Sequence, residues 1–145
     1  MFWMFIDDWT YKFGEWKHVL HKGSHDSWPN RAPGIWLHPR DNNLRIYMNT
    51  FSSIDEFVDV IGVPVSEWIH IAVRVKGRKM DVLVNGIIKT SHEFGDTLKQ
   101  NYGDLYINRL GGFGGYMSRI RYYNKAIGFR ELESLLKQGP ASSPC

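Results

Sequence analysis

Cysteine is almost absent from this chain of 145 residues, because Cys145, the last residue, is the only one. An intrachain disulfide is therefore excluded, and the redox compartment stays open. Long apolar runs are also missing. The apolar start, MFWMFI, ends at Asp7. It is too short to span a membrane, and it lacks the basic flank and cleavage site of a signal peptide. We therefore expect no membrane insertion.

The chain also lacks a large excess of either positive or negative charge. The 18 basic and 15 acidic residues are interspersed and leave a net charge of +3, so a nucleic-acid partner is not expected. The densest basic stretch is Lys76-Gly77-Arg78-Lys79. We interpret it as a solvated hairpin tip, and the alternative is contact with a phosphate or sulfate.

Aromatic residues and glycine are abundant, at 14% and 14 residues respectively, which favours strands and tight turns. Helical spacing occurs only in residues 128–139, where Leu132, Leu135 and Leu136 share one face before Gly139-Pro140. Turn signals separate strand-like segments about every 8–12 residues, as in a β-sandwich. We predict an all-β, antiparallel β-sandwich with one short C-terminal helix. Strands are expected over residues 1–6, 15–23, 34–38, 44–51, 57–61, 68–75, 80–84, 87–90, 104–109 and 116–123.

The stretch WIHIAVRVKGRKMDVLVNG (68–86) shows the strand pattern best, because its aliphatic residues alternate with Trp68, His70, Ala72 and Arg74. Asn85-Gly86 can adopt the two positive φ values of a type I′ turn. Two interpretations of the strand start stay open. In the first, Trp68 and His70 form a sugar platform. In the second, the indole packs at the sandwich rim and the imidazole bonds a neighbouring backbone group.

The chain contains no internal repeat and no domain boundary. We expect one domain over residues 1–140 and a disordered tail over residues 141–145. The first strand begins with no lead-in, so we expect the chain to be a fragment or one product of a larger polyprotein.

Histidines raise the question of a metal site. On a regular strand His18 and His21 point to opposite faces, so they cannot chelate one ion without a bulge. His25 and Asp26 lie in a loop and stay open as ligands. HEFGD at His92 resembles the start of a zinc-protease motif, but Asp stands where the second histidine is needed. We predict no metal site.

Catalytic motifs are also not supported. GGFGGYM fits neither a dinucleotide-binding loop nor an RNA-recognition strand at the positions that matter. Glu56 and Asp59 are three residues apart and face opposite sides of a strand, so they cannot flank one glycosidic bond. No catalytic residue is assigned, and an enzyme is not expected.

The polar loop SHDSWPNRAP (24–33) is the longest irregular stretch. Sugars are held by stacking on exposed rings and by a few polar side chains. We predict a ligand site with Trp28 as its platform, and the alternative is a loop that only caps the sandwich. The predicted ligand-binding residues are Asp26, Trp28, Asn30 and Arg31, joined from another loop by Asn101 and Tyr102.

Three separated segments resemble one known family. EWIHIAVRVKGRKMDVLVNG is similar to the Trp-x-His-x-Ala strand and Val-Asn-Gly turn of concanavalin A-like, laminin G-type jelly rolls. GGYMSRIRYYNKAIGFRELESLL resembles their closing strand and short helix, and KHVLHKG with PGIWLHPRDNNLRIYMNTF matches early strands. The residues of this structural motif are Trp68, His70, Asn85, Gly86 and Gly115.

The resemblance implies a jelly roll of two curved sheets that binds glycans or proteins. We therefore expect a non-enzymatic module that recognises carbohydrate or a partner protein, located extracellularly or on a virion surface, as in similar domains of large DNA viruses and phages. The alternatives are a structural virion or fibre subunit and, less favoured, a glycoside hydrolase. Calcium is common in relatives, but no ligand set matches here, so no cofactor is predicted.

The resemblance also implies a further strand, before residues 1–6, that pairs with the closing strand near residues 116–123. If it is absent, the sheet has an open edge, to which another chain can add a strand. We expect an upstream segment or a neighbouring subunit to supply it.

Overall fold

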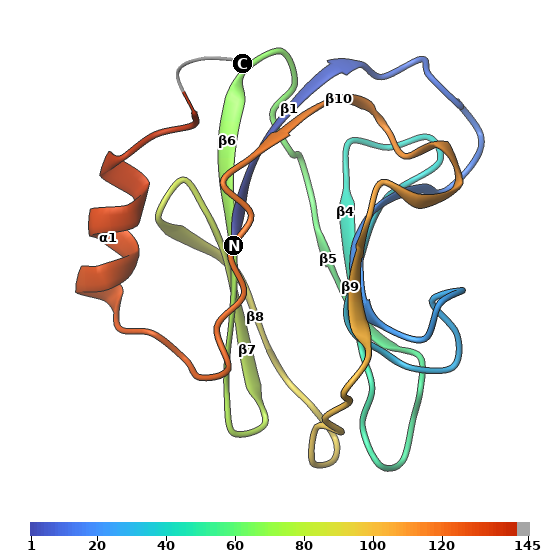
Figure 1. Cartoon of the computed structure of the whole chain (residues 1–145), viewed down its shortest axis with the longest axis vertical. Coiled ribbons are helices and arrows are strands. Elements are labelled where there is room, and N and C mark those ends of the chain that lie inside the picture. Colours follow the sequence, from blue (N-terminus) through green and yellow to red (C-terminus); the bar gives the residue numbers. More distant parts are fainter. Residues whose placement is uncertain (142–145) are drawn as a thin grey trace.

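Two antiparallel sheets of five strands face each other in the computed structural model, which describes residues 1–141 (Figure 1). Sheet A has the order β10 (Gly114–Ser118), β1 (Phe2–Asp8), β6 (Trp68–Lys76), β7 (Lys79–Val84), β8 (Ile87–Glu93). Sheet B has the order β5 (Glu56–Val60), β4 (Leu44–Met48), β3 (Arg31–Leu37), β2 (Lys17–Gly23), β9 (Asp104–Ile107). The predicted sandwich is confirmed. Cys145 and the tail beyond Ala141 lie outside the described residues.

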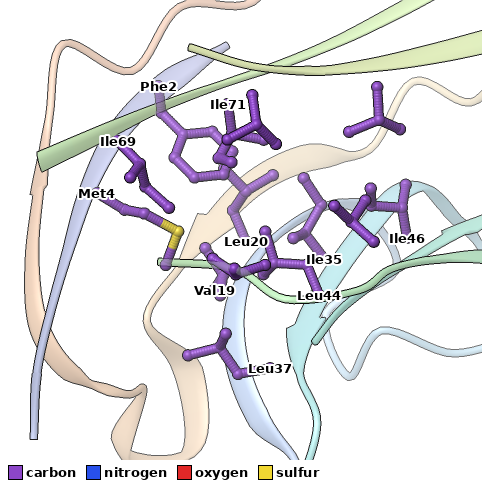
Figure 2. Close-up of a cluster of buried hydrophobic side chains, with 14 of the residues drawn as sticks. Phe2, Met4, Val19, Leu20, Ile35, Leu37, Leu44, Ile46, Ile69 and Ile71 are labelled. Atoms are coloured by element: carbon purple, nitrogen blue, oxygen red, sulfur yellow. The ribbon is translucent and has the colours of Figure 1, made fainter. Parts of the chain in front are cut away.

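The core lies between the sheets and follows the strand alternation. In β4, Leu44, Ile46 and Met48 point inward and are buried, while Arg45 and Tyr47 point outward. Figure 2 shows inward side chains of both sheets meeting in one cluster, to which β1 contributes Phe2 and Met4 and β6 contributes Ile69 and Ile71. Burial of this apolar surface is the main term that stabilises the sandwich.

The short helix α1 (Phe129–Lys137) covers the outer face of sheet A (Figure 1). Its Leu132 packs with Ala72 of β6, Leu83 of β7 and Ile127 in a second buried cluster. The helical spacing near the C-terminus therefore predicted α1 correctly. Within residues 1–141, no helix has the length and apolar character needed to cross a membrane.

Several strand bounds differ from the sequence prediction. β3 begins at Arg31, which pairs with Gly23 of β2, so the irregular stretch after β2 is shorter than predicted. β8 continues to Glu93, because its pairing with β7 extends to Lys79. β9 ends at Ile107 and a 3₁₀ turn, η1 (Arg109–Gly111), follows it. β10 ends at Ser118, where its pairing with β1 ends.

The turn between β7 and β8 is the predicted type I′ turn. Asn85 and Gly86 both have positive φ, at 52° and 82°. The Asn85 side chain also accepts a hydrogen bond from the backbone N–H of His70, at 2.9 Å. A Cβ on Gly86 would lie 2.8 Å from the Leu136 side chain, so this turn also packs closely against α1.

Replacement of Asn85 by alanine is expected to lower the free energy of unfolding by about 1–2 kcal/mol, because it removes one hydrogen bond and puts alanine, which tolerates positive φ less well than asparagine, at a left-handed position. Urea unfolding measures this. Asn85→Gly removes the backbone cost but also loses the hydrogen bond, so its free energy of unfolding should lie between those of Asn85→Ala and the parent. Equal midpoints for all three proteins would contradict this role.

The strand β1 has partners on both sides. It pairs with β6 from Phe2↔Ile71 to Phe5↔Trp68, and with β10 from Trp3↔Ser118 onward. The closing strand therefore pairs directly with β1, not with a preceding strand. The outer edge of β10 has no partner strand in the described part of the chain, so addition of a further strand there stays a prediction.

Candidate functional site

The outer face of sheet B gathers aromatic and charged side chains in two rows across its strands. Residues directly opposite each other in antiparallel strands project to the same side, so each row shares one face. One row joins His18, Trp36, Arg45 and Asp59, and the other joins Tyr106, His21, Gly34, Tyr47 and Phe57. We call this surface, with these residues, the aromatic face.

Arg45 organises one end of the aromatic face. Its guanidinium donates to both carboxylate oxygens of Asp59, at 2.8 and 3.0 Å, and this bond raises the pKa of Arg45 above its ordinary value. The guanidinium carbon lies 3.8 Å from the ring centre of Phe57 and 4.9 Å from that of Trp16. Both rings are more than a third exposed, at 41% and 37%. Exposed rings fixed by a cation can stack with the apolar face of a ligand.

The loop between β2 and β3, residues 24–30, lies at the other end of the aromatic face. It is closed by hydrogen bonds of its own: the Ser24 N–H donates to the Asn30 carbonyl at 2.9 Å, and the Asn30 N–H donates to Ser24 Oγ at 3.3 Å. The Ser27 N–H also donates to the Ser24 carbonyl, at 2.9 Å. These bonds give the polar loop a defined shape.

Trp28 and Arg31 lie together, as the predicted site requires. The Trp28 side chain is 54% exposed, and the guanidinium carbon of Arg31 lies 5.9 Å from its ring centre. Arg31 is held over Tyr47 at 3.7 Å and donates to Asp55 at 2.8 Å. A Cβ on Gly34 would come within 3.0 Å of the Arg31 side chain. The glycine therefore leaves room for Arg31 to lie against the sheet, where it is a fixed part of the surface.

Asp26 belongs to a second group on the same loop. His25 donates from Nδ1 to Asp26 at 2.9 Å, and its Nε2 lies 3.0 Å from a guanidinium nitrogen of Arg109, which donates to it. Asn30 contributes its backbone to the loop closure. The structure thus brings Trp28 next to Arg31, and Asp26 next to His25 and Arg109.

Asn101 and Tyr102 do not join this loop. Asn101 exchanges hydrogen bonds with Lys22, whose ammonium donates to the Asn101 carbonyl at 2.7 Å and whose carbonyl accepts from the Asn101 amide at 3.2 Å. Asn101 lines a cavity of about 660 Å³ whose lining does not include Trp28. The Tyr102 side chain is fully exposed. These two residues therefore lie apart from the other predicted ligand-binding residues.

His18 and His21 share one face, and the expectation of opposite faces is wrong. The β2–β3 register shifts between His18 and Leu20, so β2 contains the bulge that the regular alternation excludes. His18 Nε2 lies 2.7 Å from His21 Nδ1, and both side chains are buried. The bulge in β2 therefore brings His18 and His21, which a regular strand would separate, into contact.

The hydrogen bonds determine the protonation of this pair. The Arg109 N–H donates to His18 Nδ1 at 2.9 Å, so the proton of His18 is on Nε2. His18 then donates to His21 Nδ1, and His21 donates from Nε2 to the Ser24 carbonyl at 2.7 Å. Burial lowers the pKa of His18 to about 4 and also lowers the pKa of His21. Both imidazoles are neutral at physiological pH, and their four ring nitrogens are all bonded.

A small cavity of about 140 Å³ lies beside this pair. Trp36 and Ser27 form part of its wall, and both Trp36 Nε1 and Ser27 Oγ are buried without a hydrogen-bond partner among residues 1–141. The other lining residues are His18, His21, His25, Asp26, Arg109 and Leu110. Because a buried polar atom without a partner costs about 1–3 kcal/mol, two such atoms in one cavity indicate a place for a polar ligand group or water.

Metal ligation is not supported by this arrangement. Within residues 1–141, no group of three or more His, Cys, Asp or Glu side chains is placed to hold a metal ion. His25 and Asp26, which the sequence left open as ligands, bond to each other and to Arg109. No calcium or other ion is therefore assigned to the site.

The two carboxylates considered for glycoside hydrolysis are engaged on opposite faces of β5. Asp59 bonds Arg45 on the aromatic face, whereas Glu56 accepts from the Gly95 N–H at 3.2 Å and lies 3.2 Å from His92 Nε2. They do not flank one cleft, as the alternation predicts.

Trp68 and His70 lie on β6 of sheet A, whereas the loop of residues 24–30 joins two strands of sheet B. His70 is buried, and its ring lies 5.0 Å from that of Trp3 in an edge arrangement. Trp68 is half-buried and packs against Phe5 at 5.7 Å. The imidazole packs edge-on against an indole, and the predicted bond to a backbone group is not found among the described residues. Both rings therefore pack within sheet A, which favours the scaffold interpretation over a sugar platform.

Two antiparallel five-stranded sheets packed face to face are consistent with a concanavalin A-like jelly roll. The chain belongs to the concanavalin A-like lectin/glucanases superfamily, because a laminin G-type family model with that description matches residues 2–132. A search of curated protein sequences found no significant match.

Solved structures share the fold at low sequence identity. A candidate carbohydrate-binding protein from Bacteroides ovatus matches with a TM-score of 0.64 and 16% identity, over 91% of this chain and 38% of that one. The receptor-binding domain of botulinum neurotoxin D matches with a TM-score of 0.65 and 11% identity, over 94% and 36%. The binding domain of Paraclostridial Mosquitocidal Protein 1 matches with a TM-score of 0.61 and 16% identity, over 94% and 36%. This chain therefore spans just over a third of each of these proteins.

Proposed function

We propose that the domain is a non-enzymatic module that binds carbohydrate on the aromatic face, outside the cell or on a virion surface. The observation that carries this proposal is the small cavity in which Trp36 Nε1 and Ser27 Oγ have no partner. A sugar hydroxyl both donates and accepts, so its chemistry suits the Trp36 N–H as well as the Ser27 hydroxyl. The similarity to carbohydrate-binding and receptor-binding structures supports a binding role.

The residues around the cavity suit the rest of a sugar ring. Trp28 is exposed next to Arg31, and stacking on an indole suits the C–H face of a pyranose. Asp26 and Arg109 lie at the cavity and offer an acceptor and a donor to further hydroxyls. The neutral His18–His21 pair fixes the wall behind them, because its ring nitrogens are already bonded.

A glycan array followed by calorimetry tests this proposal. We expect Trp28→Ala to weaken binding of the best glycan by about tenfold or more, because it removes the stacking surface. Ser27→Ala should weaken it by about three- to tenfold, because one hydrogen bond is lost. Since Ser27 Oγ is buried without a partner among the described residues, Ser27→Ala should not lower the urea midpoint of the free domain and is expected to raise it.

A matched control is available on the other sheet. Tyr116 of β10 is 59% exposed, similar to Trp28, and Tyr116→Ala should not change glycan binding. The proposal fails if the parent binds no glycan on the array. It also fails if Trp28→Ala and Ser27→Ala bind as well as Tyr116→Ala.

A second candidate function is a structural subunit that neighbours join by strand addition. The observation that favours it is the outer edge of β10, which has no partner strand in the described part of the chain. Cross-linking of the protein within its native assembly tests it. Contacts from β10 to neighbouring subunits would support this role, and an aromatic face free of contacts there would keep the carbohydrate proposal.

A further inference from the structure

The cavity beside His18 and His21 has room for more than one hydroxyl. Its volume is about 140 Å³, whereas a water molecule takes up about 30 Å³ of liquid water. A hydroxyl is similar in size to water, so a single one would fill only part of the space. Close packing of a ligand against the wall adds dispersion contacts that a partly filled cavity lacks. The cavity therefore fits a substituent of several non-hydrogen atoms.

Two polar atoms define what that substituent must offer. Trp36 Nε1 carries a hydrogen and can only donate, whereas the Ser27 hydroxyl can donate or accept. Both atoms are buried without a hydrogen-bond partner among residues 1–141. The four ring nitrogens of His18 and His21 are already bonded, so they need no further partner. The substituent therefore needs an acceptor for Trp36 and a donor or acceptor for Ser27.

The rest of the inner wall is ring and aliphatic surface. The Trp36 ring centre lies 4.8 Å from that of His18, edge-on, and the His21 ring stacks on Tyr106 at 4.9 Å. Leu110 adds an aliphatic side chain to the lining. Contact of a methyl group with this surface is favourable, because it removes apolar area from water. The substituent that suits the cavity therefore also has an apolar end.

Leu110 is held at the cavity in an unfavourable backbone conformation. Its φ of 56° and ψ of 34° are left-handed, a region in which residues with a side chain are uncommon. The Lys12 ammonium, from a neighbouring loop, donates to the Leu110 carbonyl and fixes this turn. Leu110 is nevertheless 71% exposed. Backbone strain of this kind concentrates at ligand sites, so Leu110 is suited to contact an apolar part of a ligand.

The mouth of the cavity is polar. The His25 and Asp26 side chains are 65% and 84% exposed and bond to each other at 2.9 Å. Arg109, which also lines the cavity, donates to His25. Trp28, which is exposed, follows Ser27 in the same loop. A sugar ring at the mouth can therefore keep its hydroxyls among polar groups while one substituent enters the interior.

Sugar substituents differ in how many of these requirements they meet. A hydroxyl supplies a donor and an acceptor but no apolar end. A carboxylate supplies acceptors only, carries a charge that is costly to bury, and would approach the Asp26 carboxylate in the lining. An O-acetyl ester supplies a carbonyl and a methyl group but no N–H donor. An acetamido group supplies a carbonyl acceptor, an N–H donor and a methyl group together.

We propose that this cavity receives the acetamido group of an N-acetylated amino sugar. The acetamido carbonyl accepts from Trp36 Nε1, its N–H donates to Ser27 Oγ, and its methyl group contacts Leu110. The inference rests on the proposed carbohydrate function and names the class of sugar that the same site selects. Trp36, Ser27 and Leu110 are then the residues that determine specificity.

Pairs of sugars that differ only in this substituent test the inference. The probes are chitotriose with cellotriose, N-acetyllactosamine with lactose, and the methyl glycosides of N-acetylgalactosamine and galactose. Each first member has acetamido in place of hydroxyl groups, and calorimetry on the whole domain measures each affinity. In at least one pair we expect the acetamido sugar to bind at least about tenfold more tightly, from one hydrogen bond and one buried methyl group.

The outcomes separate this inference from the proposed function. Equal affinities within every pair, with binding still weakened by Trp28→Ala, would overturn the acetamido inference and leave carbohydrate binding in place. Binding of none of the acetamido sugars would also overturn the inference, and the glycan array then decides the proposed function by itself.

The indole N–H signal of Trp36 in an NMR spectrum gives a readout at the cavity itself. In the free domain this N–H has no acceptor in the described part of the chain. Saturation with the tighter acetamido sugar should move the signal downfield, because the N–H gains a hydrogen bond. Trp36→Phe identifies the signal by its loss. An unchanged Trp36 signal at saturation would contradict the assigned acceptor.

Replacement of Leu110 separates ligand contact from stability. Asparagine tolerates the left-handed region better than leucine, so Leu110→Asn should maintain or raise the thermal midpoint. It removes the apolar contact, so the preference for the acetamido sugar should shrink by about three- to tenfold. Arg119→Asn is a matched control that should keep the preference, because Arg119 also has a positive φ, at 49°, and does not line the cavity. An unchanged preference in Leu110→Asn would overturn the methyl contact.

Discussion

Lowering the pH from about 7 to about 4 is expected to cost the domain several kcal/mol of stability. The cause is the burial of His18 and His70 as neutral imidazoles, which lowers the pKa of each to about 4. In the unfolded chain both titrate near the ordinary value of 6.5. The stabilisation is therefore fully present above pH 6.5 and is lost as the pH falls toward 4. Allowing for partial solvent screening, each histidine contributes about 2 kcal/mol to this loss.

Urea unfolding at a series of pH values measures this loss, and NMR titration measures the two pKa values directly. His18→Asn keeps an acceptor for the Arg109 N–H but removes the titrating ring. This variant should be less stable than the parent near pH 7, and its stability should depend less on pH. Protonation of both His18 and His70 near pH 6.5 in the folded protein would contradict the expectation.

Replacement of Gly115 by alanine is expected to destabilise the domain by about 3 kcal/mol or more. A Cβ on Gly115 would lie 1.9 Å from the Phe5 carbonyl oxygen and 2.8 Å from the Phe113 ring. The backbone of β1 cannot move away easily, because β1 is paired on its other side with β6. The variant must separate β10 from β1 or displace a core aromatic ring. Thermal unfolding monitored by circular dichroism measures the effect.

Gly95 provides the control for this substitution. A Cβ on Gly95 would have no atom within 4 Å, and its φ is not in the left-handed region. Gly95→Ala should therefore change the free energy of unfolding by at most about 1 kcal/mol, in either direction. Equal melting temperatures for Gly115→Ala and Gly95→Ala would show that the β1–β10 contact is looser than the structure indicates.

The regular strands were the part of the fold that could be predicted from the sequence. In β4 and β6, side chains of one face are apolar and those of the other are not, and a period of two has only one structural explanation. The Asn85-Gly86 turn was also predictable, because few residue pairs accept two positive φ values. The helix was predicted from three leucines at helical spacing.

The candidate site was only partly predictable. The loop composition indicated Trp28 and Arg31, which do lie together. No sequence pattern indicated the bulge in β2, because a bulge depends on pairing with β3 and not on the residues of β2 alone. His18, His21 and Trp36 were consequently missed as neighbours. Asn101 was predicted to join the site from another loop, although its bonds to Lys22 place it at the larger cavity.

The sequence by itself determined where the regular strands lie, which side of β4 and β6 is buried, and that a short helix follows the last strand. These properties are local, because they depend on the spacing of apolar residues and on the backbone preferences of single turns. Only the tertiary structure decided which strands are neighbours and where β2 bulges. Those properties depend on contacts between residues far apart in the chain, and they create the polar cavity beside Trp36.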